Sequence, residues 1–147
     1  MIADKLKVLL EAVDVPAASL PFFKDWKREV EPKIVQSLKS SLDESFDYWN
    51  PEDSSTIIVY IKPDGSPVEQ LETGNVDYTP VGTLSIVPEL SRTGKKFNNV
   101  NVQASKIVDG EDMKRTVKIN IADLSHSDLA DSVVYNSINL LTNVGVI

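Results

Sequence analysis

The single histidine of this 147-residue chain, His126, is the first residue that could take part in catalysis. It lies in the run Ser125-His126-Ser127-Asp128, which supplies a hydroxyl, an imidazole and a carboxylate. Adjacent residues at the start of a helix point in different directions, whereas a catalytic triad gathers its members from distant segments. A helix cap accounts for all four residues, so the run predicts a cap, with catalysis by His126 as the alternative.

Carboxylates are the second candidates, because paired acids can perform acid–base catalysis or hold a hard cation. Three clusters occur: Glu52 and Asp53; Glu69, Glu72 and Asp77; and Asp109, Glu111 and Asp112. None has the spacing of a calcium loop, and turns or exposed strand edges explain each. A small hydrolase- or isomerase-like enzyme would have its site where loop 64–77 meets the start of the C-terminal helix, with His126 as the base.

A short basic loop is the nearest feature to an anion site. Arg92, Lys95 and Lys96 stand beside Phe97 and are candidate contacts for an anion or an acidic partner. Nucleic-acid binding is disfavoured, because this patch is small and the whole chain carries a net charge of −7. The chain has no cysteine, and its glycines form no phosphate-binding loop, so we predict no catalytic residue, no cofactor and no metal.

The sign of the net charge alternates from one segment of the chain to the next. Residues 51–81 carry six acidic groups against Lys62, whereas residues 82–122 carry seven basic and four acidic groups. Association between unlike surfaces of two copies is therefore conceivable, although a solubilising surface is the simpler explanation. The N-terminus does not resemble a signal peptide, and no stretch reaches the ~18 apolar residues of a membrane span. We expect a soluble protein, cytoplasmic or particle-associated.

The clearest structural element is a hairpin between residues 98 and 124. Polar and apolar residues alternate on both sides of Asp109-Gly110, a turn signal, and a two-residue turn pairs Val102 with Val117 and Val100 with Ile119. A four-residue loop would instead shift the paired residues by two positions and leave the same side chains on each face of the hairpin. Further strands are expected at residues 56–61, at 83–87 with a stop at Pro88, and on an exposed edge at 68–72.

Helices are expected at both ends of the chain. Apolar residues at helical spacing predict one helix over 2–13, an aromatic-faced helix at 22–30, and another from about Pro32 to Tyr48. At the C-terminal end, Ser125 or Ser127 would cap a helix that ends near Gly145. One stripe of this helix would cover the hairpin, leaving a candidate interface with a second copy at Tyr135, Leu140, Val146 and Ile147.

Together these patterns predict a single α+β domain over residues 1–147. Its parts are a helical region at 1–50, a four- to five-stranded antiparallel sheet at 51–124, and a closing helix at 125–147. The expected function is a non-catalytic protein-interaction or assembly subunit, such as a structural component of a viral or other large particle. It would bind a protein partner, or associate with copies of itself as a homo-oligomer, and it would not bind a membrane. The enzyme described above and an acidic inhibitor or immunity-type protein are the alternatives.

Overall fold

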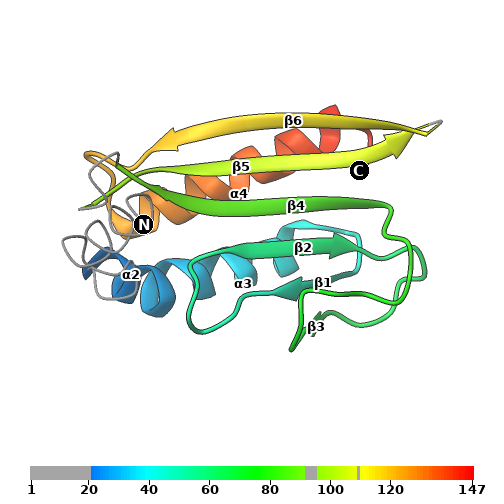
Figure 1. Cartoon of the computed structure of the whole chain (residues 1–147), viewed down its shortest axis with the longest axis horizontal. Helices are drawn as coiled ribbons and strands as arrows, with labels where there is room; N and C mark the ends of the chain where they lie inside the picture. The colour runs from blue at the N-terminus through cyan, green and yellow to red at the C-terminus, as the bar shows by residue number, and fades with distance from the viewer. Residues whose placement is uncertain (1–20, 92–95, 109) are drawn as a thin grey trace, which may run out of the picture.

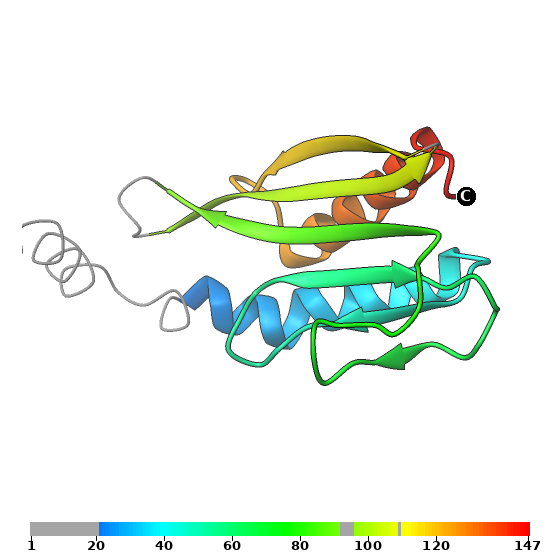
Figure 2. The same ribbon diagram turned by 45° about the vertical axis from the view of Figure 1, so that its right-hand side comes forward.

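The computed structural model describes residues 21–91, 96–108 and 110–147. The strands are β1 (Phe46–Trp49), β2 (Ile57–Ile61), β3 (Glu69–Gln70), β4 (Gly82–Leu90), β5 (Phe97–Val108) and β6 (Glu111–Asn120). The helical segments are α2 (Pro21–Asp25), η2 (Trp26–Val30), α3 (Glu31–Ser41) and α4 (His126–Asn143). The strands form one sheet in the order β3-β1-β2-β4-β5-β6, and α3 and α4 lie on the same face of it (Figures 1 and 2).

The fold is of the α+β class, as predicted, but the sheet has six strands and is mixed, which corrects the prediction of four or five antiparallel strands. Four of its pairings are antiparallel, and β3 runs parallel to β1. After β2 the chain crosses to the far side of β1, where β3 pairs with β1 and runs in the same direction. The predicted exposed edge at residues 68–72 is confirmed, since both residues of β3 are exposed.

The predicted hairpin is confirmed residue by residue. Val102 pairs with Val117 and Val100 with Ile119, and Val108 faces Glu111 across a two-residue turn. Gly110 has a φ of +79°, a left-handed conformation that glycine adopts without steric cost. Val100, Val102 and Ala104 are fully buried against the helices. The alternation therefore set both the register and the buried face.

The helical region extends only to Ser41, which corrects the prediction of helix to about Tyr48. Leu42 donates the last helical amide bond to Leu38, and its ψ of 128° is extended. Residues 46–49 then pair with β2, so Phe46 and Tyr48 share one face at a period of two. The spacing of Leu42, Phe46 and Trp49 also fits a helix. Pairing with β2 makes residues 46–49 a strand instead. The predicted helix at 2–13 lies outside the described residues.

The two predicted helices around Pro32 are one continuous segment with a π-helical turn, η2, at its centre. The amide of Glu31 donates to the carbonyl of Trp26, five residues earlier. Pro32 has no amide proton for the next bond, and it stands in the first turn of α3, where that loss is tolerated. The wider turn places Trp26 and Glu31 on the same side of the segment, facing the sheet.

β4 runs through Pro88 to Leu90, which corrects the predicted stop at Pro88. The last residue of β4 that pairs with β2 is Ile86, opposite Ile57. Pro88 lies beyond that point and has a partner, Val100, on only one side. A proline without its amide donor is acceptable where one side of the strand is unpaired.

The C-terminal helix is capped as predicted. Ser125 Oγ accepts a hydrogen bond of 3.0 Å from the Asp128 amide, and Gly145, with a φ of +81°, follows the helix. Val146 then packs on Gly82, where a β-carbon would lie 2.3 Å from a methyl group of Val146. One hydrophobic cluster runs from Trp26 through the inner face of the sheet to Val146. No helix among the described residues is long and apolar enough to span a membrane.

Candidate functional site

Within the described part of the chain, no helix or loop covers the face of the sheet opposite the helices over β4, β5 and β6 (Figure 1). Because directly paired residues share a face, the strand registers define this surface, here called the open face. It consists of Thr83, Ser85, Val87, Glu89, Asn99, Asn101, Gln103, Ser105, Lys114, Thr116, Lys118 and Asn120. All these side chains are partly or fully exposed, and most are uncharged hydrogen-bonding groups. The open face is thus a flat surface rich in donors and acceptors.

Hydrogen bonds on the open face leave some of its polar groups unused. Thr83 and Ser105 share a hydroxyl–hydroxyl bond of 2.6 Å, and Thr116 donates to Gln103 at 3.2 Å. The Asn101 Oδ1 atom is enclosed yet has no hydrogen-bond partner among the described residues. An enclosed carbonyl oxygen without a donor costs free energy, and this one has no accessible surface through which a bound molecule could reach it.

The other half of this face, over β1 and β2, is covered by the loop of residues 71–80. Tyr60 donates a hydrogen bond of 2.6 Å to the carbonyl of Gly74, whose backbone lies against the ring of Trp49. Tyr78 donates one of 2.8 Å to Asp47 Oδ2. The loop therefore restricts binding on the outer face to the open face.

Asp47 lies at the centre of a buried polar cluster under this loop. Its Oδ1 is 2.7 Å from Lys62 Nζ, and both side chains are more than nine-tenths buried. Lys62 also donates to the carbonyl of Pro67. Burial, and then the adjacent Asp47 carboxylate, raise the pKa of Tyr78, so the phenol stays protonated and can donate. Tyr78 holds the loop of residues 71–80 to Asp47, and Lys62 holds the turn at Pro67 to the same cluster, so the described contacts of the cluster are structural.

Glu31 is the second buried charge, and it ties three segments together. Trp26 Nε1 donates to it at 3.1 Å, Lys27 Nζ at 2.9 Å and Asn50 Nδ2 at 2.7 Å. Lys27 also donates to the carbonyls of Pro51 and Ser54. A shallow pocket of about 320 Å³ lies above Glu31. Since the donors already present saturate the carboxylate, this pocket offers no reactive acid.

The pKa of the Glu31 carboxyl lies above its ordinary value of 4.5, chiefly because burial disfavours the charge, while the bonds from Lys27, Asn50 and Trp26 oppose the rise. The folded state therefore keeps this proton to a higher pH than the unfolded chain. The stability that it contributes is complete below the unfolded pKa and is lost as the pH rises through the folded pKa.

Glu31→Gln removes this titration, so the stability of the wild type relative to the variant should fall as the pH rises above the ordinary carboxyl pKa of 4.5. Urea unfolding at a series of pH values measures it. Glu44→Gln, a change at an exposed acid, is the matched control. A difference between wild type and Glu31→Gln that stays constant or grows with pH would contradict this account.

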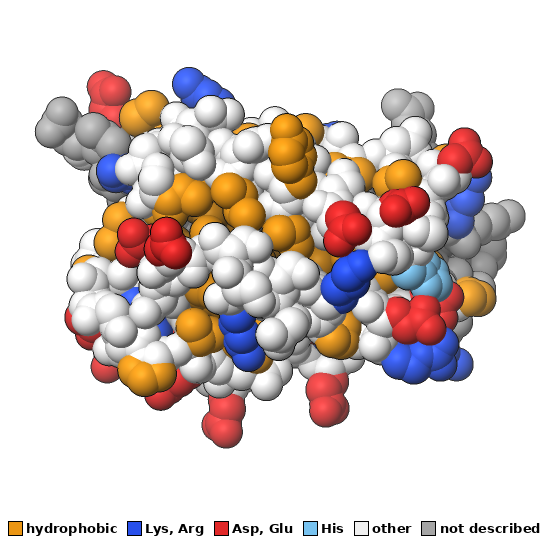
Figure 3. Space-filling model, turned by 180° about the vertical axis from the view of Figure 1, so that it is seen from behind, with side chains coloured by type: hydrophobic (Ala, Val, Ile, Leu, Met, Phe, Trp, Pro, Cys, Tyr) orange, Lys and Arg blue, Asp and Glu red, His pale blue; other side chains and the backbone are white. Residues whose placement is uncertain are grey.

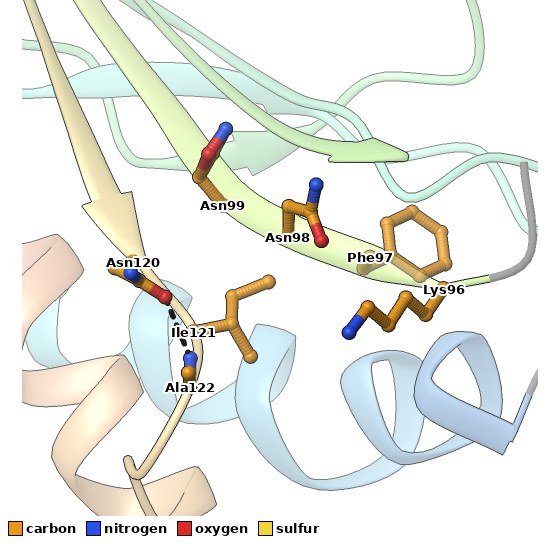
Figure 4. Close-up of a pocket in the computed structure, with 7 residues that line it drawn as sticks. All are labelled: Lys96, Phe97, Asn98, Asn99, Asn120, Ile121 and Ala122. Atoms are coloured by element: carbon orange, nitrogen blue, oxygen red, sulfur yellow. Dashed lines mark hydrogen bonds between the residues drawn. The ribbon is translucent and has the colours of Figure 1, made fainter. Parts of the chain in front are cut away.

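A pocket of about 490 Å³ lies where β5 begins and β6 ends (Figure 4). Lys96, one of the three predicted anion contacts, lines it together with Asn98, Asn99 and Asn120. Asn120 already accepts a hydrogen bond of 2.9 Å from the Ala122 amide. Arg92 and Lys95 lie outside the described residues. Of the predicted basic contacts, the structure thus describes only Lys96, which lines the pocket together with amide side chains.

His126 is the first residue of α4 and faces the helical region. Its Nδ1 is 2.5 Å from Glu29 and its Nε2 is 3.6 Å from Asp25, and the single histidine appears among charged side chains in Figure 3. The loop of residues 64–77 lies at the opposite end of the sheet from the start of α4 (Figure 1). The residues of the alternative enzyme site are therefore not brought together. His126 instead links α4 to α2 and η2.

The predicted interface residues divide into two pairs. Tyr135 is 68% exposed and Ile147 is 40% exposed, so both are available to a partner. Leu140 and Val146 are each only 8% exposed and belong to the described core, so little of either side chain is available to a partner. Leu140 lies on the buried face of α4, and Val146 fills the space above Gly82.

Among the described residues, no group of three or more acids or histidines could hold a metal ion. In the described part of the third acidic cluster, Glu111 is exposed at the hairpin end, and Asp112 pairs with Lys114 at 3.1 Å. Glu31 and Asp47, which are buried in the described structure, were not predicted from the sequence. Asp47 alternates with apolar Phe46 and Tyr48, a signal that is visible only once the segment is taken as a strand.

In comparisons with protein-family models, with curated proteins and with solved structures, nothing matched this chain.

Proposed function

We propose that the chain is a non-catalytic protein-interaction or assembly subunit and that the open face binds the partner. The observation that carries the proposal is the one-sided sheet: of the residues that the structure describes, the helices lie on one face, and no helix or loop covers β4, β5 and β6 on the other. The serine, threonine, asparagine and glutamine side chains of this face supply donors and acceptors for the direct and water-bridged hydrogen bonds of a protein interface.

The side chains of the open face also disfavour nucleic acid as the partner. The face contains no aromatic ring on which a base could stack. Lys118 lies 3.3 Å from Glu89, so its charge is already balanced. A structural component of a viral or other large particle, or an acidic inhibitor of another protein, would be a narrower form of this role.

Site-specific photo-crosslinking in cells of origin tests the proposal. A photoreactive phenylalanine derivative at Gln103, in the middle of the open face, is expected to give a covalent adduct with one defined protein. The same residue at Tyr135, which is exposed on the helical layer, is the control. Mass spectrometry of the adduct identifies the partner. An adduct at Tyr135 alone, or at neither position, would refute the open face as the binding surface.

A further inference from the structure

The shallow pocket above Glu31 lies between α3 and the edge of the sheet. It measures about 320 Å³. α3 contributes Gln36 and Lys39 to its lining, and the sheet edge contributes Tyr48 and Gln70, with Asn50 beside them. Gln70 pairs with Tyr48, so both side chains lie on the side of the sheet that carries the helices. This pocket is therefore separate from the open face.

The two charged groups at the base of the pocket already bind each other. Lys27 Nζ donates to both oxygens of the Glu31 carboxylate and to the carbonyls of Pro51 and Ser54. An ammonium group has only three N–H donors, so these acceptors leave Lys27 none for a ligand. The Glu31 carboxylate is saturated by the same lysine and by the other donors described above. A ligand therefore meets an ion pair whose opposite charges compensate each other.

Lys39, by contrast, has no acidic partner within the described part of the chain. Its ammonium nitrogen lies 5.4 Å from the centroid of the Tyr48 ring, and its side chain is exposed. The ring attracts the cation but does not replace an oxygen acceptor for the three N–H groups. Apart from Glu31, no acid lines the pocket. The Lys39 charge is therefore available to an anion that enters the pocket.

Three side-chain amides add hydrogen-bond donors to this charge. Gln70 Nε2 donates to Asn50 Oδ1 at 2.7 Å, and Asn50 Nδ2 donates to Glu31 at 2.7 Å. Each amide NH₂ group has two N–H donors, so Gln70 and Asn50 each keep one. The Gln36 side chain forms no hydrogen bond to any described residue. Unused donors and one uncompensated positive charge thus border the same pocket.

We propose that this pocket binds a small organic carboxylate. Lys39 supplies a charge-assisted hydrogen bond to the carboxylate, and the amides of Gln36 and Gln70 supply neutral ones. The apolar part of the ligand lies against Val35 and the ring of Tyr48, which also line the pocket. A volume of about 320 Å³ is enough for such a molecule. A phosphate group carries up to about two negative charges at neutral pH, more than Lys39 alone can balance.

Titration of the full chain with sodium benzoate, followed by NMR of the side-chain amides, is the first test. The amide resonances of Gln36, Asn50 and Gln70 are expected to shift and to saturate, with a dissociation constant of about 1 mM. Benzamide has a similar shape without the charge, so it should bind about tenfold or more weakly. Equal binding of the two compounds, the absence of a saturable shift, or tighter binding of inorganic phosphate than of benzoate would overturn the proposal.

Substitution of the pocket lysine is the second and sharper test. Lys39→Gln should raise the dissociation constant of benzoate about tenfold or more, whereas Lys39→Arg keeps the charge and should retain most of the affinity. Lys24→Gln makes the same change at an exposed lysine of α2 outside the pocket, and it should bind benzoate like the wild type. Lys39 is exposed, so the NMR spectrum without benzoate should show unchanged folding. Benzoate binding that survives Lys39→Gln, or that Lys24→Gln weakens equally, would show that benzoate does not bind at this pocket.

Discussion

Asp47→Ala should lower the free energy of unfolding by about 3–5 kcal/mol, because it leaves the Lys62 ammonium group buried without its counter-charge. Lys62 is 6% exposed, and the carboxylate lies 2.7 Å away. Tyr78 would also lose its acceptor. A domain of this size has a total stability of about 5–15 kcal/mol, so the loss is a large part of it. Urea unfolding followed by circular dichroism measures the change.

The double substitution of Asp47→Leu with Lys62→Met is the control. It removes both charges and keeps side chains of similar volume, so it should recover most of the stability that Asp47→Ala loses. Recovery would show that the cost arises from the unpaired charge and not from lost packing. If the double variant is as unstable as Asp47→Ala, the ion pair itself stabilises the fold and the explanation is wrong.

Trp26→Ala should destabilise the protein by about 3–5 kcal/mol, the range for removing a fully buried large aromatic side chain. Trp26 is 0% exposed, and its ring packs against Phe22 with the centroids 5.9 Å apart. Its indole nitrogen also donates to Glu31. The variant therefore creates a cavity at the junction of η2 with the sheet and removes one donor from a buried acid. Thermal and urea unfolding both report the loss.

Trp26→Phe separates the two contributions. It keeps most of the apolar volume and removes only the indole donor, so its cost should be about 1–3 kcal/mol, the range for weakening a buried hydrogen-bonded group. Phe22→Ala, at a partly buried position nearby, should cost less than Trp26→Ala. Equal losses for Trp26→Ala and Phe22→Ala would mean that Trp26 is not the centre of this packing.

The sequence predicted best those elements whose signals are local. The hairpin followed from alternation and from Asp109-Gly110, and the cap at Ser125 and the end of α4 at Gly145 followed from residue type. The strand at Ile57–Ile61 followed from its β-branched run. In each case the residues within one element carry enough information to define it.

The wrong predictions concern segments whose structure depends on pairing with another part of the chain, which the local residue pattern does not show. Residues 46–49 fit helical spacing and strand alternation equally, and their neighbour across the sheet, β2, is about ten residues away. Pro88 signals a stop unless the end of β2 is known. The parallel placement of β3 depends on a path around β1 that no pattern of residues specifies. Element type was therefore predictable, whereas pairing was not.

The candidate site was less predictable than the fold, because its surfaces are defined by which strands are neighbours. Gln103 and Thr116 were expected on the exposed side of the hairpin, and they lie there. Nothing in the sequence indicated that Ser85 of β4 extends the same surface, or that the loop of residues 71–80 covers the rest. Leu140 and Val146 were predicted to lie outside the apolar stripe by which the C-terminal helix covers the hairpin, but both belong to the described core.

The π-helical turn at η2 also governs how the helical region tolerates changes of length. One residue of a helix corresponds to a rotation of about 100°. The π turn holds one residue more than an ordinary helical turn, because the amide of Glu31 bonds to a carbonyl five residues earlier. Deleting an exposed residue of η2, such as Arg28, would leave Glu31 four residues after Trp26, the spacing at which an ordinary helix places two side chains on one face. Glu31 and the buried side of α3 would then still face the sheet together with Trp26. A deletion within α3, which has no extra residue, would instead rotate every later residue of that helix away from its buried side.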